Sequence, residues 1–210
     1  MMHNTSSLLT CGIYSVPEAS RLTGVSTGRI RRWATAAGQP LWTPALPDQD
    51  GKSAITFHEM LEAAAVALLL DGAGHTLAGF RDLHAAVPSA HRFPLLNSNV
   101  VLSDSLGSPL RPLLDQLDYR PGAALPHRWW PTGRDAFIVL DPARSFGEPV
   151  LDRTGTPTRA IAAPILAGNE TAKSSASCWE ASIQEVEAAV YFERRLGCGV
   201  GFFSLQRGSP

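Results

Sequence analysis

The sequence predicts a mainly α-helical protein with a β-containing middle, that is, an α+β fold, and three observations support this prediction. Apolar residues recur at helical spacing in the first third of the chain, as in FHEMLEAAAVALLL (57–70). Between Pro88 and Pro149, short apolar runs are separated by prolines and turn residues, as is typical of strands and loops. Helical spacing returns after Val150. We therefore expect helices at both ends of the chain and β-structure between them.

Composition limits the class of protein. The chain has 210 residues, of which 44% are hydrophobic and 18% charged, so one or two domains with a sizeable core are expected. The formal net charge of −1 gives no overall attraction to nucleic acid, and any such attraction must come from a local patch. Cys11, Cys178 and Cys198 are far apart, which predicts reduced thiols rather than a disulfide framework or a zinc site.

The N-terminal segment and the apolar runs predict a cytoplasmic protein. No basic region precedes an apolar run near the N-terminus, so we expect no secretory signal. The longest apolar stretch, AAAVALLL (63–70), is too short for a bilayer, which needs about 20 residues.

Capping residues divide the first third into helices. Ser15 and Ser26 are predicted N-caps, and Gly24 and Gly38 are the predicted ends of the two helices that follow them. A proline-rich loop or hairpin comes next, and Thr56 is predicted to cap a long helix. The expected helices are 16–23, 27–38, 57–74 and 76–87.

The rest of the chain is predicted to hold a β-ribbon and three helices. PHRWWPTGRDAFIVLDP (126–142) has two strand-like runs with a turn at Pro131–Gly133, and NVVLSD (99–104) is a further predicted strand. The expected helices are 156–168, a weak one at 169–180, and 181–197. The expected domains are a winged helix-turn-helix at 12–87, a β-rich middle at 88–148, a helical domain at 149–196 and a tail at 197–210.

The stretch GVSTGRIRRW (24–33) has the spacing of a helix-turn-helix. This motif needs a small residue in its first helix, a glycine at the turn and an aliphatic residue in the second helix, and Ser20, Gly24 and Ile30 fit these positions. Ile30, Trp33, Ala34 and Ala37 are predicted to be buried, and the arginines to face outward. We predict DNA contacts from Arg29, Arg31 and Arg32, with Ser26 and Thr27 near a phosphate. The alternative from spacing alone is a solvated basic face on an ordinary helical hairpin.

The order of these elements resembles the N-terminal domain of MerR-type regulators. YSVPEASRLTGVSTGRIRRW (14–33) matches their helix-turn-helix, and AITFHEMLEAAAVALLLDGAGHTLAGFRDL (54–83) matches the helices that follow. The proline-rich loop between them lies where a winged helix has its wing. The resemblance implies binding to double-stranded DNA.

A second resemblance covers the C-terminal third. RSFGEPVLDRTGTPTRAI (144–161) and SIQEVEAAVYFERRL (182–196) resemble a small three-helix antitoxin domain, although KSSAS (173–177) and Pro164 depart from its usual pattern. The chain as a whole resembles VapB-type antitoxins of type II toxin–antitoxin systems. This resemblance implies a repressor that binds its own operator and neutralises a PIN-like ribonuclease toxin. We expect a homodimer, because one recognition helix covers only a few base pairs.

The C-terminal helix and the tail offer candidate toxin contacts. Ile183, Val186, Ala189, Val190 and Leu196 are predicted to form the apolar stripe of the helix. Basic side chains suit the acidic Mg²⁺ site of such a nuclease, and aromatic side chains are frequent anchors at interfaces. The candidates are Arg194, Arg195, Phe202, Phe203 and Arg207. For the phenylalanines, packing on their own domain is the open alternative.

Other features predict no catalytic or cofactor site. The histidines have no metal-ligand spacing, and the carboxylates between Asp104 and Asp141 form no pattern suited to acid–base chemistry. Trp129–Trp130 is predicted to pack in the core rather than to stack on bases. We expect no enzyme, no metal and no cofactor. The competing functions are a MerR-like transcriptional regulator with a C-terminal sensing domain and a pure interaction module.

Overall fold

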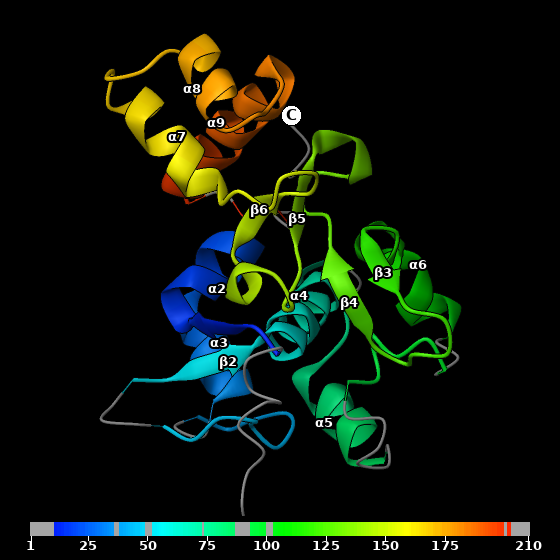
Figure 1. Cartoon of the computed structure of the whole chain (residues 1–210). Helices are drawn as coiled ribbons and strands as arrows, with labels where there is room; N and C mark the ends of the chain where they lie inside the picture. Colours follow the sequence, from blue (N-terminus) through cyan, green and yellow to red (C-terminus); the bar gives the residue numbers. More distant parts are fainter. Residues whose placement is uncertain are drawn as a thin grey trace, which may run out of the picture. The chain divides into compact units, whose positions relative to one another are not determined.

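The fold is helical at both ends of the described chain and carries two small sheets, which confirms the predicted mainly α, α+β class (Figure 1). The computed structural model describes residues 11–35, 38–48, 52–72, 74–86, 93–99, 103–199 and 201–202. Its residues group into two compact units. Among the described residues, unit 1 comprises 11–12 and 128–199, and unit 2 comprises those of 13–127 together with 201–202. Of the described residues, this division assigns 93–99 and 103–127 to the N-terminal helices and 128–148 to the C-terminal helices, whereas the sequence predicts one middle segment at 88–148.

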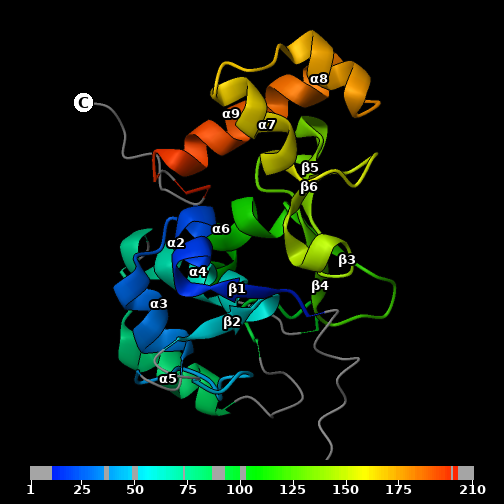
Figure 2. The ribbon, with the colours of Figure 1, turned by 60° about the vertical axis from the view of Figure 1, so that its left-hand side comes forward.

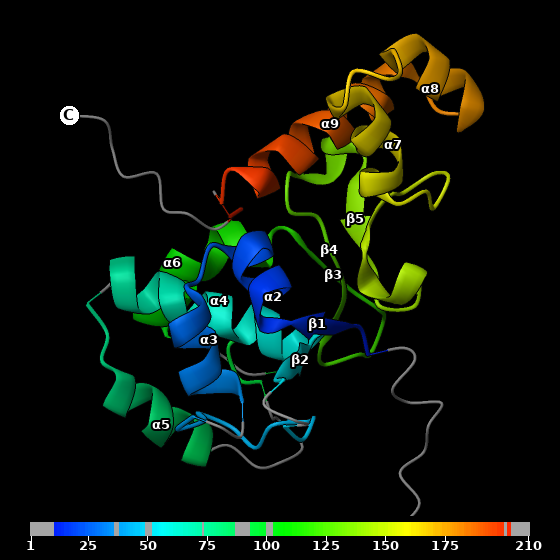
Figure 3. The same ribbon diagram turned by 90° about the vertical axis from the view of Figure 1, so that its left-hand side faces the viewer.

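Unit 2 begins with a two-stranded sheet and three helices. Strand β1 (Ile13–Ser15) pairs antiparallel with β2 (Ala54–Thr56), with Ile13 opposite Thr56. Between these strands lie α2 (Val16–Thr23) and α3 (Thr27–Ala34), and β2 leads directly into α4 (Phe57–Gly72). Figure 3 shows α2 and α3 beside α4, and the three helices contact one another. The loop after α3 therefore ends in a strand that returns beside the start of α2.

Helix α3 is shorter than predicted. It ends at Ala34, because Thr35 takes an extended conformation with φ −122° and ψ 155°. The hydroxyl of Thr35 donates to the carbonyl oxygen of Arg31 at 2.9 Å, and this side-chain bond satisfies a carbonyl at the helix end. Gly38 therefore lies beyond the helix, and Ala37, predicted to be buried, lies outside the described residues.

Two further helices and one strand complete unit 2. These are α5 (Leu77–Ala86), α6 (Asp104–Leu114) and β3 (Leu117–Tyr119). The prediction of strands and loops alone after Pro88 is wrong at α6, which contains Pro109 and Pro112. Leu110 and Leu113 of α6 are fully buried, and burial of these leucines outweighs the backbone hydrogen bonds that the prolines remove. Half of the predicted strand 99–104, residues 100–102, lies outside the described residues, and Asp104 begins α6 instead.

Helix α4 is the core of unit 2. Its first eleven residues are all buried except His58. Two of the buried residues are glutamates, and both have polar partners, as burial of charged groups requires. Glu59 accepts hydrogen bonds from the backbone N–H groups of Thr56 at 2.9 Å and Ala45 at 2.7 Å, so it caps the helix and also holds the loop that follows α3.

Glu62 connects α4 to α5 and to the segment before α6. Its Oε1 lies 3.0 Å from Nε2 of His84 and accepts from the backbone N–H of Leu95 at 3.2 Å. Nδ1 of His84 donates to the carbonyl oxygen of Phe80 at 2.7 Å, which orients Nε2 toward the carboxyl group of Glu62. Burial raises the pKa of Glu62, and the bond to His84 partly offsets this effect.

Unit 1 combines short strands with three helices (Figure 2). Strand β4 (Pro126–Trp129) runs across the boundary between the units, and its Trp129 pairs with Leu140 of β5 (Ile138–Leu140). Strand β6 (Pro149–Leu151) pairs antiparallel with β5, with Val139 opposite Val150. The predicted β-ribbon is therefore present. The helices are α7 (Thr158–Leu166), α8 (Ala172–Cys178) and α9 (Ile183–Gly197), all close to their predicted bounds.

The core of unit 1 includes the β5–β6 hairpin, α7, which contacts both β6 and α9, and the buried side of α9. Trp129 is fully buried, and Trp130 packs with Val139 and Val150, so both tryptophans pack as predicted. Val186, Ala189, Val190 and Phe192 are the buried residues of α9 with apolar side chains. Ile183, predicted to join this stripe, is instead 47% exposed.

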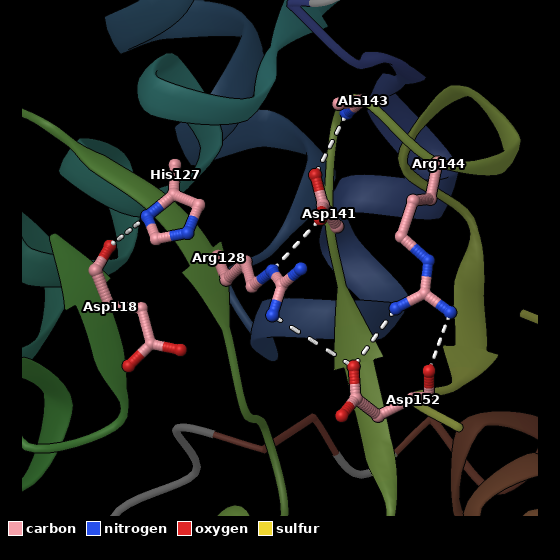
Figure 4. A network of polar contacts seen from close by, with 7 residues as sticks. All are labelled: Asp118, His127, Arg128, Asp141, Ala143, Arg144 and Asp152. Carbon is pink, nitrogen blue, oxygen red and sulfur yellow. Dashed lines mark hydrogen bonds and ion pairs between the residues drawn. The ribbon is translucent and has the colours of Figure 1, made fainter. Parts of the chain in front are cut away.

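Ion pairs connect β4 with the segments that follow β5 and β6, and a further ion pair lies at the start of α9. Nε of Arg128 donates to Asp141 at 2.9 Å, and Nη1 of Arg144 donates to Asp152 at 2.9 Å (Figure 4). At α9, Glu185 forms a capping box with Ser182 and accepts two hydrogen bonds from Arg153, at 3.0 and 3.1 Å. These bonds lower the pKa of Glu185 to about 2.

Candidate nucleic-acid interface

The turn between α2 and α3 is fixed by backbone conformation and side-chain caps. Gly24 ends α2 in the left-handed region with φ 79°, and its N–H donates to the carbonyl oxygen of Ser20 at 2.8 Å. This conformation strongly favours glycine. Ser15 forms a capping box with Glu18 at the start of α2, and Ser26 accepts from the N–H of Arg29 at the start of α3. The caps predicted at Ser15 and Ser26 and the turn predicted at Gly24 are confirmed.

Helix α3 has one buried side and one open side. Ile30, Trp33 and Ala34 are buried against the rest of unit 2, as predicted. Ser26, Gly28, Arg31 and Arg32 are exposed, and Thr27 is half-buried. The open side therefore carries two arginines, a hydroxyl group and a stretch of bare backbone at Gly28.

Arg31 and Arg32 are the unpaired cations of α3. Within the part of the chain that the structure describes, neither guanidinium forms a hydrogen bond or an ion pair. A methyl group added at Gly28 would meet no other atom within 4 Å, so the backbone there is open to the approach of a ligand.

Arg29, unlike Arg31 and Arg32, forms an ion pair with the rest of unit 2, which corrects the prediction that all three arginines face outward. Its Nη1 and Nη2 donate to the two carboxylate oxygens of Asp71 in α4, at 2.7 and 2.8 Å. Its guanidinium carbon also lies 5.5 Å from the ring centroid of Trp33. The hydrogen bonds to Asp71 raise the pKa of Arg29. The reason is helical spacing: Arg29 is four residues before the buried Trp33 and shares its side of α3.

The ion pair reduces the local charge. The sequence gives an excess of +3 between Ser15 and Gly38, from four arginines and Glu18. Asp71, which is distant in sequence and close in space, brings the sum for this surface to +2. The remaining excess lies on Arg21, Arg31 and Arg32, which are all exposed.

The loop after α3 is tied to the helix-turn-helix. The N–H of Leu41 donates to the carbonyl oxygen of Trp33 at 2.8 Å, and Glu59 holds Ala45. This loop, predicted as a wing, contributes β2 to a sheet with β1 rather than forming a hairpin of its own within the described residues.

Gly201 and Phe202 also pack on this motif, whereas the sequence predicts a separate tail at 197–210. The N–H of Phe202 donates to the carbonyl oxygen of Leu22 in α2 at 3.0 Å, and the Phe202 side chain is buried. A methyl group added at Gly201 would lie 1.9 Å from the backbone nitrogen of Gly24. Phe202 therefore packs on its own unit and is not an exposed toxin anchor.

The other predicted toxin contacts divide into three cases. Arg194 is exposed on α9, and Arg195 is half-buried and has an interaction partner. Phe203 and Arg207 lie outside the described residues.

Neither a metal site nor a membrane span is found in the described chain. No group of three or more His, Cys, Asp or Glu side chains among the described residues is placed to hold a metal ion. No helix described by the structure combines the length and apolar character needed to cross a membrane.

Comparison with known proteins supports the fold alone. No family model matches the chain, and no curated protein matches it. Among solved structures, the chain is similar to the crystal structure of Rv2018 from Mycobacterium tuberculosis, with a TM-score of 0.62 and 24% sequence identity. The match covers 84% of this chain and 96% of that one. The two proteins therefore share an architecture over most of their length.

Proposed function

We propose that this chain is a DNA-binding repressor of the antitoxin type, which binds an operator through α3 and neutralises a PIN-like ribonuclease toxin. The observation that carries the DNA-binding part is the open side of α3, where Arg31 and Arg32 are exposed and unpaired beside the bare backbone of Gly28.

The geometry of this side suits a major groove. The groove admits an α-helix, and arginine binds guanine edges or phosphates through its planar set of donors. Gly28, in the first turn of α3, lets the helix backbone approach the duplex closely, and Arg31 and Arg32 follow one turn later. Ser26 and Thr27 lie at the helix N-terminus, where hydroxyl and backbone N–H groups suit a phosphate. Arg29 is assigned a different role, that of holding α3 to α4.

The antitoxin part is supported by the surface of unit 1. Four large apolar side chains of this unit are exposed outside α9: Phe137, Phe146, Leu166 and Trp179. Phe137 and Phe146 also have positive φ angles, 66° and 56°, which bulky residues rarely adopt and which occur often at functional sites. Exposed aromatic residues are common anchors of protein interfaces. A protein partner is therefore the best-supported role for unit 1.

Binding to the DNA upstream of the chain's own reading frame tests the first part. The purified chain should retard this duplex in a gel shift at moderate salt, and selection from a randomised duplex library should enrich a two-fold symmetric site. The Arg31→Ala/Arg32→Ala variant should lose retention. The matched control, Arg159→Ala/Lys173→Ala, removes two exposed charges of unit 1 and should retain it. Failure of the wild-type chain to bind in either format would refute the DNA-binding part.

Co-expression with the products of the adjoining reading frames tests the second part. A tagged chain should co-purify with a small nuclease and inhibit its RNA cleavage. A chain that binds DNA but captures no neighbouring product would instead support a regulator whose C-terminal unit has another role.

A further inference from the structure

The outward face of α9 is a continuous stripe that unit 1 does not use. Gln184, Glu187, Tyr191, Arg194 and Cys198 follow one another at intervals of three and four residues, so they lie on one side of the helix. All five are exposed, and Tyr191 is 61% exposed. The opposite side of α9, with Val186, Ala189 and Phe192, is buried. We refer to these five exposed residues as the α9 stripe.

The charges of the stripe have no partners within the described part of the chain. Neither Glu187 nor Arg194 forms a side-chain hydrogen bond or ion pair there. The two are seven residues apart, or about 10 Å along the helix axis, whereas pairs within a helix form at three or four residues. They cannot satisfy each other in one helix, and Tyr191 lies between them.

The same spacing makes the stripe complementary to itself. When two copies of α9 run antiparallel about a two-fold axis, residues at equal distances from the axis face each other. An axis midway between Glu187 and Arg194 places each Glu187 opposite the Arg194 of the other copy. Tyr191 then lies next to the axis, and Ile183 faces the region of Cys198. Two ion pairs would thus flank a central pair of aromatic rings, and Ile183 would be covered at each end.

We infer that the α9 stripe is the contact through which two copies of this chain associate, with their α9 helices antiparallel and crossing at Tyr191. The occupant is a second copy because the stripe carries one acidic and one basic group at symmetric positions, whereas a partner with an acidic surface would be repelled by Glu187. Tyrosine and arginine are also frequent at the energetic centre of interfaces. The association gives one assembly two α3 helices, as a two-fold operator requires.

Charge reversal tests this contact without DNA or toxin, so its outcome is separate from that of the proposed function. Light scattering coupled to gel filtration should give the wild-type chain twice the mass of one chain. Glu187→Arg and Arg194→Glu should each raise the dimer dissociation constant by at least about tenfold, because like charges then face each other. The double variant Glu187→Arg/Arg194→Glu should restore the dimer, because each new arginine faces a new glutamate. Lys173→Glu, an exposed reversal on α8, is the control and should not change the mass.

Cross-linking tests the position of the axis. In a background with Cys11, Cys178 and Cys198 replaced by serine, Tyr191→Cys should give a covalent dimer with a short bis-maleimide, and Lys173→Cys should not. A monomeric wild-type chain, single reversals without effect, a double variant that stays monomeric, or equal cross-linking at both positions would each overturn the inference. Circular dichroism of each variant verifies that the helices are retained.

Discussion

The guanidinium of Arg29 on α3 binds the carboxylate of Asp71 on α4 through two parallel hydrogen bonds, at 2.7 and 2.8 Å. The two residues are 42 positions apart in sequence. This ion pair separates the arginines of α3 by role, because Arg29 connects two helices whereas Arg31 and Arg32 stay available to a ligand.

Asp71→Asn should free Arg29 for phosphate. The ion pair is partly exposed, at 42% and 43% of its two side chains, so the loss in unfolding free energy should be small, about 0.2–1 kcal/mol. The dependence of log affinity for DNA on log salt should become steeper by up to about 1, which corresponds to one added phosphate contact. Fluorescence anisotropy on a non-operator duplex at several salt concentrations measures this slope. Asp82→Asn, an exposed change of the same charge on α5, is the control, and an equal slope in both variants would count against a specific role of the ion pair.

Substitutions at Gly28 should separate stability from DNA binding. Gly28→Ala adds a methyl group in open space and should stabilise unit 2 by about 0.5–1 kcal/mol, because alanine is the better helix former. Gly28→Glu fits the same space but brings a negative charge to the duplex, so it should abolish the gel shift. Urea denaturation provides the stability of each variant. Retention of DNA by the Gly28→Glu variant would show that this side of α3 does not face the duplex.

Substitution of Gly201 should release Phe202 from the helix-turn-helix. An alanine there would clash with the backbone of Gly24, 1.9 Å from its nitrogen, and so displace Phe202. The expected loss in unfolding free energy is about 3–5 kcal/mol, as for removal of a buried phenylalanine, and Phe202→Ala should give a similar loss. Gly197→Ala, where an added methyl meets nothing within 4 Å, should be neutral or slightly stabilising. Equal stability of the Gly201→Ala and Gly197→Ala variants in thermal denaturation would contradict the packing of Gly201 and Phe202 on α2.

Glu185 should make unit 1 sensitive to acid. Its hydrogen bonds to Arg153 lower its pKa to about 2, and a lowered pKa stabilises the folded state where the carboxylate is charged. The stabilisation of the folded state by the charged Glu185 carboxylate is therefore complete above the ordinary glutamate pKa of about 4.3, and it is lost as the pH falls toward 2. Glu185→Gln should lower the unfolding free energy of unit 1 at pH 7, by an amount that the water around the exposed Arg153 keeps small. Denaturation of the wild-type chain and the Glu185→Gln variant at pH 7, 4 and 2.5 measures the difference in their unfolding free energies. This difference should shrink as the pH falls, and a constant difference would exclude a charge effect.

Features with local signals could be predicted from the sequence. Ser15, Gly24 and Ser26 determine the caps and the turn of the helix-turn-helix, because each acts on backbone groups within four residues. Helices α7 and α9 follow from apolar spacing in the same way, whereas the serine-rich α8 gives only a weak signal.

Features that depend on residues distant in sequence could not be predicted. The role of Arg29 is decided by Asp71, and the burial of Phe202 by α2. Helix α6 was missed because its two prolines suggest a loop, whereas the buried positions of Leu110 and Leu113 stabilise a helix. Each case requires the tertiary structure, in which packing outweighs the local preference.

The central claim is that Arg31 and Arg32 on the open side of α3 contact DNA. The affinity of four proteins for one duplex, chosen by selection from the randomised library, tests this claim most directly. The proteins are the wild-type chain, Arg31→Ala, Arg32→Ala, and the charge-neutral double variant Arg29→Ala/Asp71→Ala. We predict that each of the first two variants loses at least about tenfold in affinity, and that the double variant stays within about threefold of wild type, because its charge toward the phosphates is unchanged. Equal affinity of all four proteins, or a loss confined to the double variant, would contradict the account.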